Sequence, residues 1–230
     1  MFLARAFRRV GSDHRRNHAQ GKPPRPLKIG KTRFAAIDFE SAGSAPGKTD
    51  EPVQIAVVHL VGPEIKPSLC AYVKAGSPVT WAARKVHGIT DSMIEDAPRF
   101  VDLWPRIKSD MEGCWIVAHG AATEKRFLRV FPFHSFGPWV DTLDLARAVY
   151  PGLRSHALGE VIKVIGLEKE PEIQAEGFRW HDARCDAIAS LVLLRHLIAV
   201  CGLADAEAEV LQSAGLEGYF KMRSDKSRKE

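Results

Sequence analysis

Two carboxylates, Asp38 and Glu40, stand two residues apart at the end of the apolar run 34–40. The run is rich in β-branched and aromatic residues, and it predicts a buried strand. Alternate side chains of a strand share a face, so we expect both carboxylates on one face of the sheet and Phe39 on the other. Adjacent carboxylates repel each other unless a cation lies between them, which indicates a divalent-metal site with oxygen ligands. The alternative, from this pair alone, is a strand end with solvated acids.

A third acid, Asp186, stands near the start of the strong helical pattern over 183–200. Asp182 is expected to cap this helix, which would leave His181 in the preceding loop, where it can lie over Asp186. An acid on an otherwise apolar inward face is costly unless it is paired. Asp186 is therefore a candidate third ligand, and the alternative is a buried acid paired with Arg184 or another base.

The elements that must hold these groups show strand patterns first and helix patterns later. Apolar runs at 53–58 and 69–73 follow the first strand after short loops, which predicts three antiparallel strands. The stretch 43–49 is similar to a phosphate-binding loop, but it lacks a required glycine and a strand follows it, so we interpret it as a hairpin loop. A short buried strand is expected at 115–118. This order indicates an α/β fold, a mixed sheet with helices on its faces.

Helical spacing of apolar residues and capping signals predict the remaining elements. Asp141 and Ser155 are expected to cap the third and fourth helices, and Gly166 is expected to end the fourth. Phe127 and Val130 are expected to pack inward from the second helix. The predicted helices span residues 98–111, 121–130, 143–149, 157–165, 183–200 and 204–213.

Charge is unevenly distributed along the 230 residues, whose formal net charge is +5. Residues 1–33 hold ten Lys or Arg and one acid, and residues 221–230 hold five basic and two acidic residues, which leaves −7 on residues 34–220. An acidic body suits a cation site, while basic ends suit a polyanion such as nucleic acid, or an anionic membrane surface. Solubilising tails are the alternative. We predict one core domain over 31–215, a basic flexible segment at 1–30 and a basic tail at 216–230.

The four cysteines are widely spaced and form no zinc or redox motif, which favours reduced core residues of a cytoplasmic protein. No apolar run approaches ~18 residues, so the sequence predicts no membrane span. The basic N-terminal segment lacks the continuous apolar stretch of a secretory signal, and an organellar transit peptide is the other interpretation of it.

Five motifs occur in one order along the chain. Three of them are Asp38-x-Glu40 at a strand end, an acid that follows His119-Gly120, and His181 with Asp186 at a helix start. The other two are Val-His-Gly-Ile-Thr at 86–90 and Asp-Thr-Leu-Asp-Leu-Ala-Arg at 141–147. Together they resemble the motifs of the DEDDh 3′–5′ exonucleases, the DnaQ-like group of the ribonuclease-H-like superfamily. The resemblance covers residues 33–201.

The resemblance implies a ribonuclease-H-like fold, a mixed five-stranded sheet whose first three strands are antiparallel, with helices on both faces. It implies that Asp38, Glu40 and Asp186 hold one Mg²⁺ or Mn²⁺, and that Asp38 and Glu124 attend a second ion. His181 would then be the general base. The implied substrate contacts are Ser41, His87, His119 and Gly120. From their chemistry alone, the two histidines are also interpreted as hydrogen-bonded loop or strand-end residues.

Two motifs depart from the family pattern. The second usually reads His-Asn-Ala-x-Phe-Asp, and residues 119–124 read His-Gly-Ala-Ala-Thr-Glu. Glu124 keeps the charge of the usual aspartate and adds a methylene, and the alternative is a surface acid followed by Lys125 and Arg126. Ser41-Ala42 stand where two threonines are common, which alters the expected contacts with the terminal sugar of the substrate.

The activity implied by the resemblance is metal-dependent hydrolysis at the 3′ end of a nucleic acid, with release of nucleoside 5′-monophosphates. A single-stranded DNA or RNA end is the expected substrate, because the terminal base must unstack to enter the site. One alternative is a degenerate, non-cleaving nucleic-acid-binding module of the same fold. Another is a subunit whose tails dock a polymerase or another replication or repair protein. The family often dimerises, so a homodimer is among the expected partners.

Overall fold

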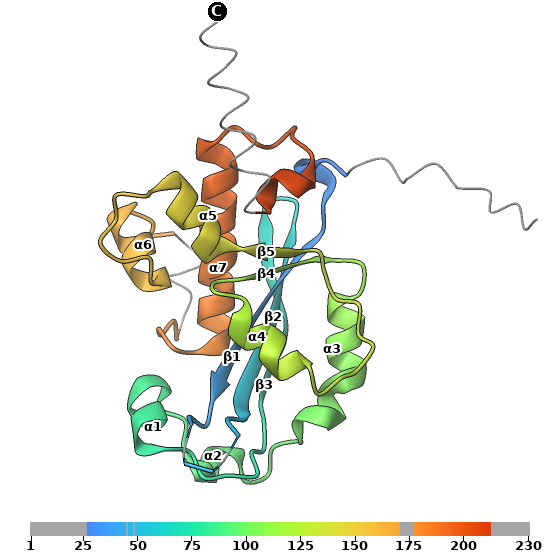
Figure 1. Ribbon diagram of the computed structural model, residues 1–230, viewed down its shortest axis with the longest axis vertical. Helices are drawn as coiled ribbons and strands as arrows, with labels where there is room; N and C mark the ends of the chain where they lie inside the picture. The colour runs from blue at the N-terminus through green and yellow to red at the C-terminus, as the bar shows by residue number, and fades with distance from the viewer. Residues whose placement is uncertain (1–26, 45, 48, 171–176, 213–230) are drawn as a thin grey trace, which may run out of the picture.

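A five-stranded sheet forms the centre of the computed structural model, which describes residues 27–44, 46, 47, 49–170 and 177–212 (Figure 1). The strand order is β3-β2-β1-β4-β5. β2 pairs antiparallel with both β1 and β3, while β4 and β5 run parallel to β1. The prediction of a mixed sheet with three antiparallel strands first is confirmed. The strands are β1 (Phe34–Ser41), β2 (Pro52–Val61), β3 (Glu64–Tyr72), β4 (Trp115–Ala118) and β5 (Trp139–Asp141).

Helices cover both faces of the sheet (Figure 1). The α-helices are α1 (Trp81–His87), α2 (Asp91–Ile94), α3 (Trp104–Met111), α4 (Ala122–Leu128), α5 (Thr142–Val149), α6 (Leu158–Val164) and α7 (Ala183–Val200). Three short 3-10 turns are η1 (Ile29–Lys31), η2 (Phe100–Leu103) and η3 (Ala208–Leu211). α5, α6 and α7 lie on one face, α3 and α4 lie on the other, and α1 and α2 lie beyond the end of β1.

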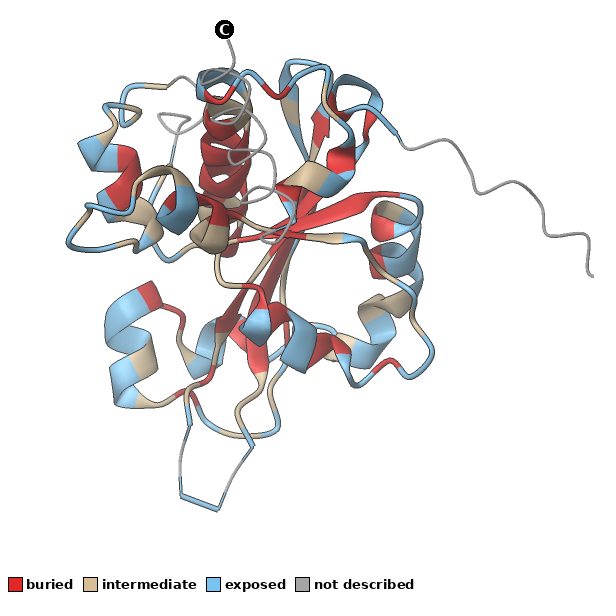
Figure 2. Cartoon of the chain, turned by 45° about the horizontal axis from the view of Figure 1, so that its top comes forward, coloured by how far each residue is buried: buried red, intermediate tan, exposed pale blue. Residues whose placement is uncertain are grey.

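Alternate residues of β1 face two different cores. Figure 2 shows that the central strands are mostly buried. Ala36 belongs to the core under α5, α6 and α7, where Leu191 is fully buried. Ile37 and Phe39 belong to the core under α3 and α4. Since side chains alternate along a strand, Asp38 and Glu40 project on the same face as Ala36, toward α7.

Two predicted helices have a different form in the structure. The pattern over 98–111 divides into η2 and α3, because Pro105 has no backbone N–H and suits the first turn of a helix. The stretch predicted as a helix at 204–213 contains only the short turn η3 in its described part. The predicted orientation of Val130 is also wrong, since this side chain is 48% exposed whereas Phe127 is buried.

Three of the predicted helix-end residues are confirmed, and one is wrong. Asp141 and Asp182 cap α5 and α7 through their side chains, as predicted. Ser155 does not cap α6: its hydroxyl accepts from the N–H of Ala157, and Ala157 itself is the N-cap of a helix that begins one residue later. Gly166 follows α6 with a positive φ of 73°, as a helix end requires. α1 and α2 were not predicted.

The predicted basic segments lie largely outside the described residues. Within the described part, residues 28–30 pack against residues 204–207, where the N–H of Ile29 donates to the carbonyl of Ala206 (3.0 Å). No disulfide joins the four cysteines, of which Cys70 is exposed and the other three are buried. None of the helices in the described residues combines the length and the apolar character needed to span a membrane.

Candidate active site

β1 carries its two carboxylates beyond the end of its parallel neighbour. β4 pairs with β1 only over 34–36, so the later part of β1 keeps β2 on one side and has α4 on the other. Asp38 is partly exposed there, and Glu40 is 9% exposed. The ladder with β2 becomes irregular between Glu40 and Ser41, where the chain leaves the sheet. Both acids therefore lie at an open end of the sheet.

The first turn of α7 brings a third acid and a histidine to this end of the sheet. Asp182 Oδ1 accepts two backbone hydrogen bonds of this turn, at 3.1 and 3.3 Å, and so caps the helix. His181 has a φ of +60°, and its backbone N–H donates to Asp186 Oδ2 at 3.1 Å. One ligand atom from each of Glu40, His181 and Asp186 lies within 4.8 Å of the other two. His181 thus lies in the loop beside Asp186, as the capping argument predicts.

Gln54 on β2 fixes the start of α7 to the sheet. This side chain is 3% exposed, and it makes two hydrogen bonds to the helix start. Its Nε2 donates to Asp182 Oδ2 (3.0 Å), and its Oε1 accepts from the N–H of Ala183 (3.0 Å). Gln54 is also the register partner of Glu40, so α7 begins beside that carboxylate. Sequence reasoning missed Gln54, because a single polar residue within an apolar strand gives no local signal.

α4 brings a fourth acid to the site. Asp141, at the end of β5, accepts from the N–H groups of Gly120 (2.9 Å) and Ala121 (2.8 Å) and so fixes the turn before α4. Gly120 has a φ of +85°, a conformation that favours glycine. Glu124 lies in the first turn of α4 and is 5% exposed, so the alternative of a surface acid is wrong. Its charge lies near enough to raise the pKa of Asp38.

The four carboxylates have raised pKa values, and burial is the largest cause in each. The pKa of Glu40 rises to about 8, and those of Glu124 and Asp186 rise to about 7. The pKa of Asp38 rises well above its usual value, with repulsion from Asp186, Glu124 and Glu40 as further causes. Repulsion from Asp141 contributes to the raised pKa of Glu124. The hydrogen-bond donors and basic side chains around the site therefore do not fully stabilise the four carboxylates in their ionised form.

Two carboxylate oxygens at this site lack a hydrogen-bond donor. Among the described residues, Glu124 Oε2 and Asp186 Oδ1 are the buried side-chain oxygens without a partner. Buried oxygens of this kind are costly, and divalent cations with oxygen ligands would satisfy them and remove the repulsion between the acids. Carboxylates suit Mg²⁺ and Mn²⁺, so the donor set fits the ions that the sequence predicts.

Both ring nitrogens of His87 are hydrogen bonded to the protein backbone. Its Nδ1 accepts from the N–H of Ile89 (3.0 Å), so Nε2 carries the proton that it donates to the carbonyl of Ser41 (3.0 Å). Burial lowers the pKa of His87, which favours this neutral form. The ring links the loop after α1 to the end of β1, and it positions Ser41 beside the acids.

The ring of His119 is also hydrogen bonded on both sides. Nε2 lies 2.7 Å from the carbonyl of His156, and Nδ1 lies 3.0 Å from Thr142 Oγ1. Burial lowers the pKa of His119. The N–H of Gly120 is already donated to Asp141. Both histidines therefore match the alternative interpretation of hydrogen-bonded residues, and their contacts with a substrate stay predictions.

A cavity of about 460 Å³ opens beside His181 and Asp186. Its walls include Leu158 on α6 and two aromatic side chains, Phe178 and Trp180, whose ring centroids lie 5.1 Å apart at 87°. Aromatic walls next to a charged site suit a flat ring that carries a charged group. Sequence reasoning did not identify this aromatic pair, because the two residues precede the helix in a stretch without periodicity.

One known protein family matches the part of the chain that contains the acids of this site. A family model described as RNase_T, exonuclease, matches residues 35–194, which include all of the acids described above. The solved structure of Exonuclease X in complex with 5′ overhanging duplex DNA is similar to this chain, with a TM-score of 0.59 and 26% identity. That similarity covers 77% of this chain and 99% of the other.

Two curated proteins show similar levels of identity. The chain is 31% identical over 168 residues to Exodeoxyribonuclease 10 of Escherichia coli, a match that covers 72% of this chain and 69% of that protein. It is 31% identical over 173 residues to the PolC-type DNA polymerase III of Thermotoga maritima, a match that covers 73% of this chain. The chain spans only 12% of the length of that polymerase.

Proposed function

This chain belongs to the RNase_T exonuclease family, and we propose that it removes nucleotides from the 3′ end of a DNA or RNA strand. The family match agrees with the resemblance to DEDDh exonucleases in the motifs. The observation that carries the proposal is the clustering of four acids, two of which have a carboxylate oxygen without a hydrogen-bond partner. The acids are Asp38, Glu40, Glu124 and Asp186. Four acids without cations would repel a phosphodiester, so we expect the activity to depend completely on divalent metal.

The acids divide into two proposed ligand groups. Asp38, Glu40 and Asp186 would hold one Mg²⁺ or Mn²⁺, and Asp38 and Glu124 would hold a second. When bound, such ions neutralise charge on the phosphodiester and lower the pKa of the attacking water. The unpaired Asp186 Oδ1 and Glu124 Oε2, one in each group, support this division.

His181 is the proposed general base. Its side chain is exposed, and a ring nitrogen lies within 4.8 Å of carboxylate oxygens of Glu40 and Asp186. The imidazole would take a proton from water as the water oxygen bonds to phosphorus. The bond from phosphorus to the 3′ oxygen then breaks, solvent supplies the proton to that oxygen, and a nucleoside 5′-monophosphate leaves.

The cavity beside His181 supports a role in binding the terminal nucleotide. Phe178 and Trp180 offer an aromatic surface for its base, next to the carboxylates that would attend its phosphate. A base can reach this surface only after it leaves a stacked duplex, so a single-stranded end is the proposed substrate.

The relatives also support a proposed partner protein for this activity. The match to PolC-type polymerases covers a small part of those proteins and supports an association of this domain with a polymerase. Copurification with the full chain and with a variant lacking residues 1–30 would test whether the basic segment carries that contact. The cytoplasmic location and the homodimer stay predictions.

Single-stranded DNA and RNA of one sequence, labelled at the 5′ end, test the function. With Mg²⁺ or Mn²⁺ we expect a ladder that shortens from the 3′ end, no ladder with EDTA, and none with Asp38→Ala. Glu209→Gln, on η3, is the matched control and should keep the wild-type ladder. Metal binding without any shortening would instead identify the non-cleaving module, and failure to bind Mn²⁺ would contradict the site itself.

A further inference from the structure

Arg179 lies in the sequence between the two aromatic residues of the cavity beside α6, and its side chain takes another direction. Phe178 and Trp180 line that cavity, and a Cβ atom on Gly159 of α6 would lie 3.4 Å from the ring of Trp180. The guanidinium of Arg179 instead lies against Gly88, in the loop after α1, where a Cβ atom would be 3.2 Å from Nη1. Figure 1 shows α6 above and α1 below the start of α7, so the rings and the guanidinium flank that start from two sides.

The guanidinium of Arg179 is close enough to the acids to act on their charge. Its Nη2 lies 4.0 Å from Asp182 Oδ2, beside the first turn of α7. Burial raises the pKa of Glu40 to about 8, and the charge of Arg179 offsets only part of this rise. Arg179 is therefore a neighbour of a proposed metal ligand that does not neutralise it.

The donors of Arg179 are not used by the part of the fold that the structure describes. Its guanidinium donates no hydrogen bond to a described residue, and its side chain is 54% exposed. Charge-assisted hydrogen bonds are normally about 2.7–2.9 Å long, so the contact of 4.0 Å with Asp182 is weak. Asp182 Oδ2 also accepts from Gln54 at 3.0 Å. The guanidinium is thus exposed at the edge of the site with its donors available.

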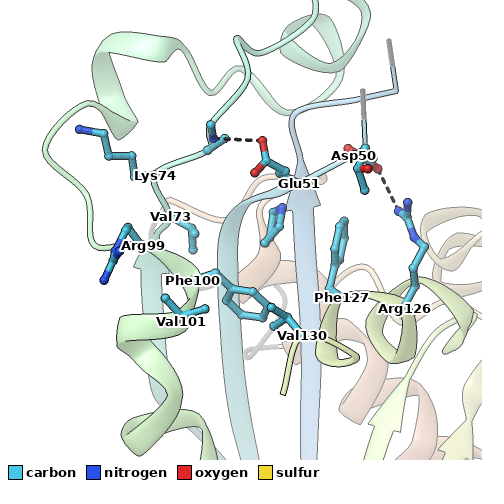
Figure 3. Close-up of a pocket in the computed structure, with 14 residues that line it drawn as sticks. Asp50, Glu51, Val73, Lys74, Arg99, Phe100, Val101, Arg126, Phe127 and Val130 are labelled. Atoms are coloured by element: carbon cyan, nitrogen blue, oxygen red, sulfur yellow. Dashed lines mark hydrogen bonds and ion pairs between the residues drawn. The ribbon is translucent and has the colours of Figure 1, made fainter. Parts of the chain in front are cut away.

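The other basic side chains that act on the charge of the acids have closer partners. They are Lys125 and Arg126, whose charges lower the pKa of the buried acid of α4. Figure 3 shows Arg126 paired with Asp50, at 2.9 Å, and Lys125 lies over an aromatic ring of β5, 5.0 Å from its centroid. Within the described residues, Arg179 is the arginine near these acids that has no close partner.

An exposed guanidinium beside a cation site suits a phosphate. The planar fork of its donors can bind two oxygens of one phosphate, which the single ammonium of a lysine cannot match. In the proposed reaction, the phosphate that is cleaved must lie among the acids. Since Arg179 is near Glu40, a phosphate that binds to it is the cleaved one or its neighbour along the strand.

We propose that the guanidinium of Arg179 binds the phosphate of one of the two linkages nearest the 3′ end of the substrate strand. This inference rests on the proposed exonuclease function. The aromatic cavity would then hold the terminal base on one side of the start of α7, and Arg179 would hold the backbone on the other. Such a contact positions the strand without reading its sequence, because every linkage carries the same phosphate.

A scan with neutral linkages tests the proposal. Fluorescence anisotropy measures the binding of a single-stranded DNA octamer to the full chain in Ca²⁺, with one methylphosphonate linkage moved along the strand. In Arg179→Ala the intact octamer should bind about tenfold more weakly. The loss of affinity that a methylphosphonate causes should shrink about tenfold at one of the two linkages nearest the 3′ end and stay the same at the others. Arg179→Lys should recover part of the affinity, because it keeps the charge without the fork.

Arg99→Ala is the matched control for these measurements. Arg99 pairs with Asp102, three residues later, in the same spacing as Arg179 and Asp182. It stands at the start of η2, beside the hollow shown in Figure 3, and none of the four acids lines that hollow. This variant should keep the wild-type affinity and the wild-type scan. Titration with Mn²⁺ adds a second measurement: Arg179→Ala should bind the metal at least as tightly as the wild type, because a cation near the ions has been removed.

The outcomes separate this inference from the proposed function. Methylphosphonate losses that are the same in Arg179→Ala and the wild type, or that change only at linkages farther from the 3′ end, would overturn the phosphate contact even if the wild type shortens the strand. Weaker Mn²⁺ binding in Arg179→Ala would show that this side chain holds the acids in place, and would also overturn it. A wild type that shows the linkage-specific change but never shortens a strand would keep the phosphate contact and remove the exonuclease function.

Discussion

Gln54 and Asp182, which are 128 residues apart in the sequence, are joined by a hydrogen bond of 3.0 Å at the point where α7 meets the sheet. The same amide accepts from the N–H of Ala183, so the first residues of the helix are held by β2. Gln54 faces Glu40 in the β-ladder, and Asp186 lies one turn into the helix. This contact therefore sets the separation between the acids of β1 and the acid of α7.

Replacement of Gln54 by leucine should weaken both the fold and the site. The change leaves the buried N–H of Ala183 without its acceptor and removes the amide that donates to Asp182 Oδ2, which costs about 1–3 kcal/mol of the free energy of unfolding. Urea denaturation of the metal-free protein measures the loss, and isothermal titration with Mn²⁺ should show weaker binding. Gln212→Leu is the control, because that side chain is exposed and its change should stay within ~0.5 kcal/mol. An unchanged denaturation midpoint for Gln54→Leu would contradict the role of this contact.

His181→Ala should separate a base from a ligand. If the imidazole takes the proton from water, kcat falls by about 10²- to 10⁴-fold while Mn²⁺ binding changes little. His134→Ala, in the loop before β5, should keep the wild-type rate. Loss of Mn²⁺ affinity in parallel with the rate would show instead that His181 is a ligand, as its distance from Glu40 and Asp186 would also allow.

The stability of the metal-free protein should fall as pH rises from about 4.5 to about 8. The pKa values of Glu124 and Asp186 rise to about 7 and that of Glu40 to about 8 in the folded state, from ordinary values of 4.5, 3.8 and 4.5. The folded state thus holds these protons more tightly, so the stabilisation is complete below the unfolded values and is lost as pH rises through the folded ones. For each group, a tenfold difference in proton affinity between the folded and unfolded states corresponds to about 1.4 kcal/mol.

Denaturation at several pH values, with and without Mn²⁺, checks this dependence. Burial lowers the pKa values of four described histidines, and a lowered histidine pKa gives a slope of the opposite sign. These residues are His59, His87, His119 and His196. Saturating Mn²⁺ should remove most of the loss at about pH 8.5, because a cation replaces the protons among the carboxylates. Asp186→Asn should flatten the profile, and an equally steep profile in that variant would show that the slope arises elsewhere.

Replacement of Glu124 by glutamine should change stability and activity in opposite directions. Glu124→Gln removes a buried charge, so at about pH 8.5 the metal-free protein should become more stable by about 1 kcal/mol or more. The same change should reduce Mn²⁺-dependent cleavage by at least about 10²-fold, since the amide is a poor ligand for a hard cation. Glu124→Asp, with the charge retained, should keep measurable cleavage. Glu112→Gln, exposed at the end of α3, serves as the control for both measurements. Equal activity of Glu124→Gln and the wild type would exclude this acid from the metal site.

Local patterns in the sequence predicted much of the scaffold. The alternation over 34–40 placed Asp38 and Glu40 on one face, and the periodicity from Ala183 to Val200 gave the bounds of α7. Asp182 and Asp141 were identified as caps because capping depends on neighbours within a few residues. These features are local, so the order of residues along the chain is enough to predict them.

Other features depend on which elements pack together, and the sequence did not predict them. α1 and α2 are short, without a long apolar period, and lie over a small core around Ile89 and Ile94 that forms only when the loops meet. Val130 follows an apolar period but lies past the last turn of α4, where its side chain is 48% exposed. Short elements of this kind gain their stability from tertiary contacts rather than from propensity.

The order of residues alone established the set of acids, the strand and helices that carry them, and the family that they resemble. Packing in three dimensions was needed to bury Glu124 beside Asp38 and to hold the start of α7 against the sheet through Gln54. The difference lies in distance along the chain. Charge repulsion, desolvation and cavity shape arise between groups that are far apart in sequence, and their values are fixed only when the sheet and helices have packed.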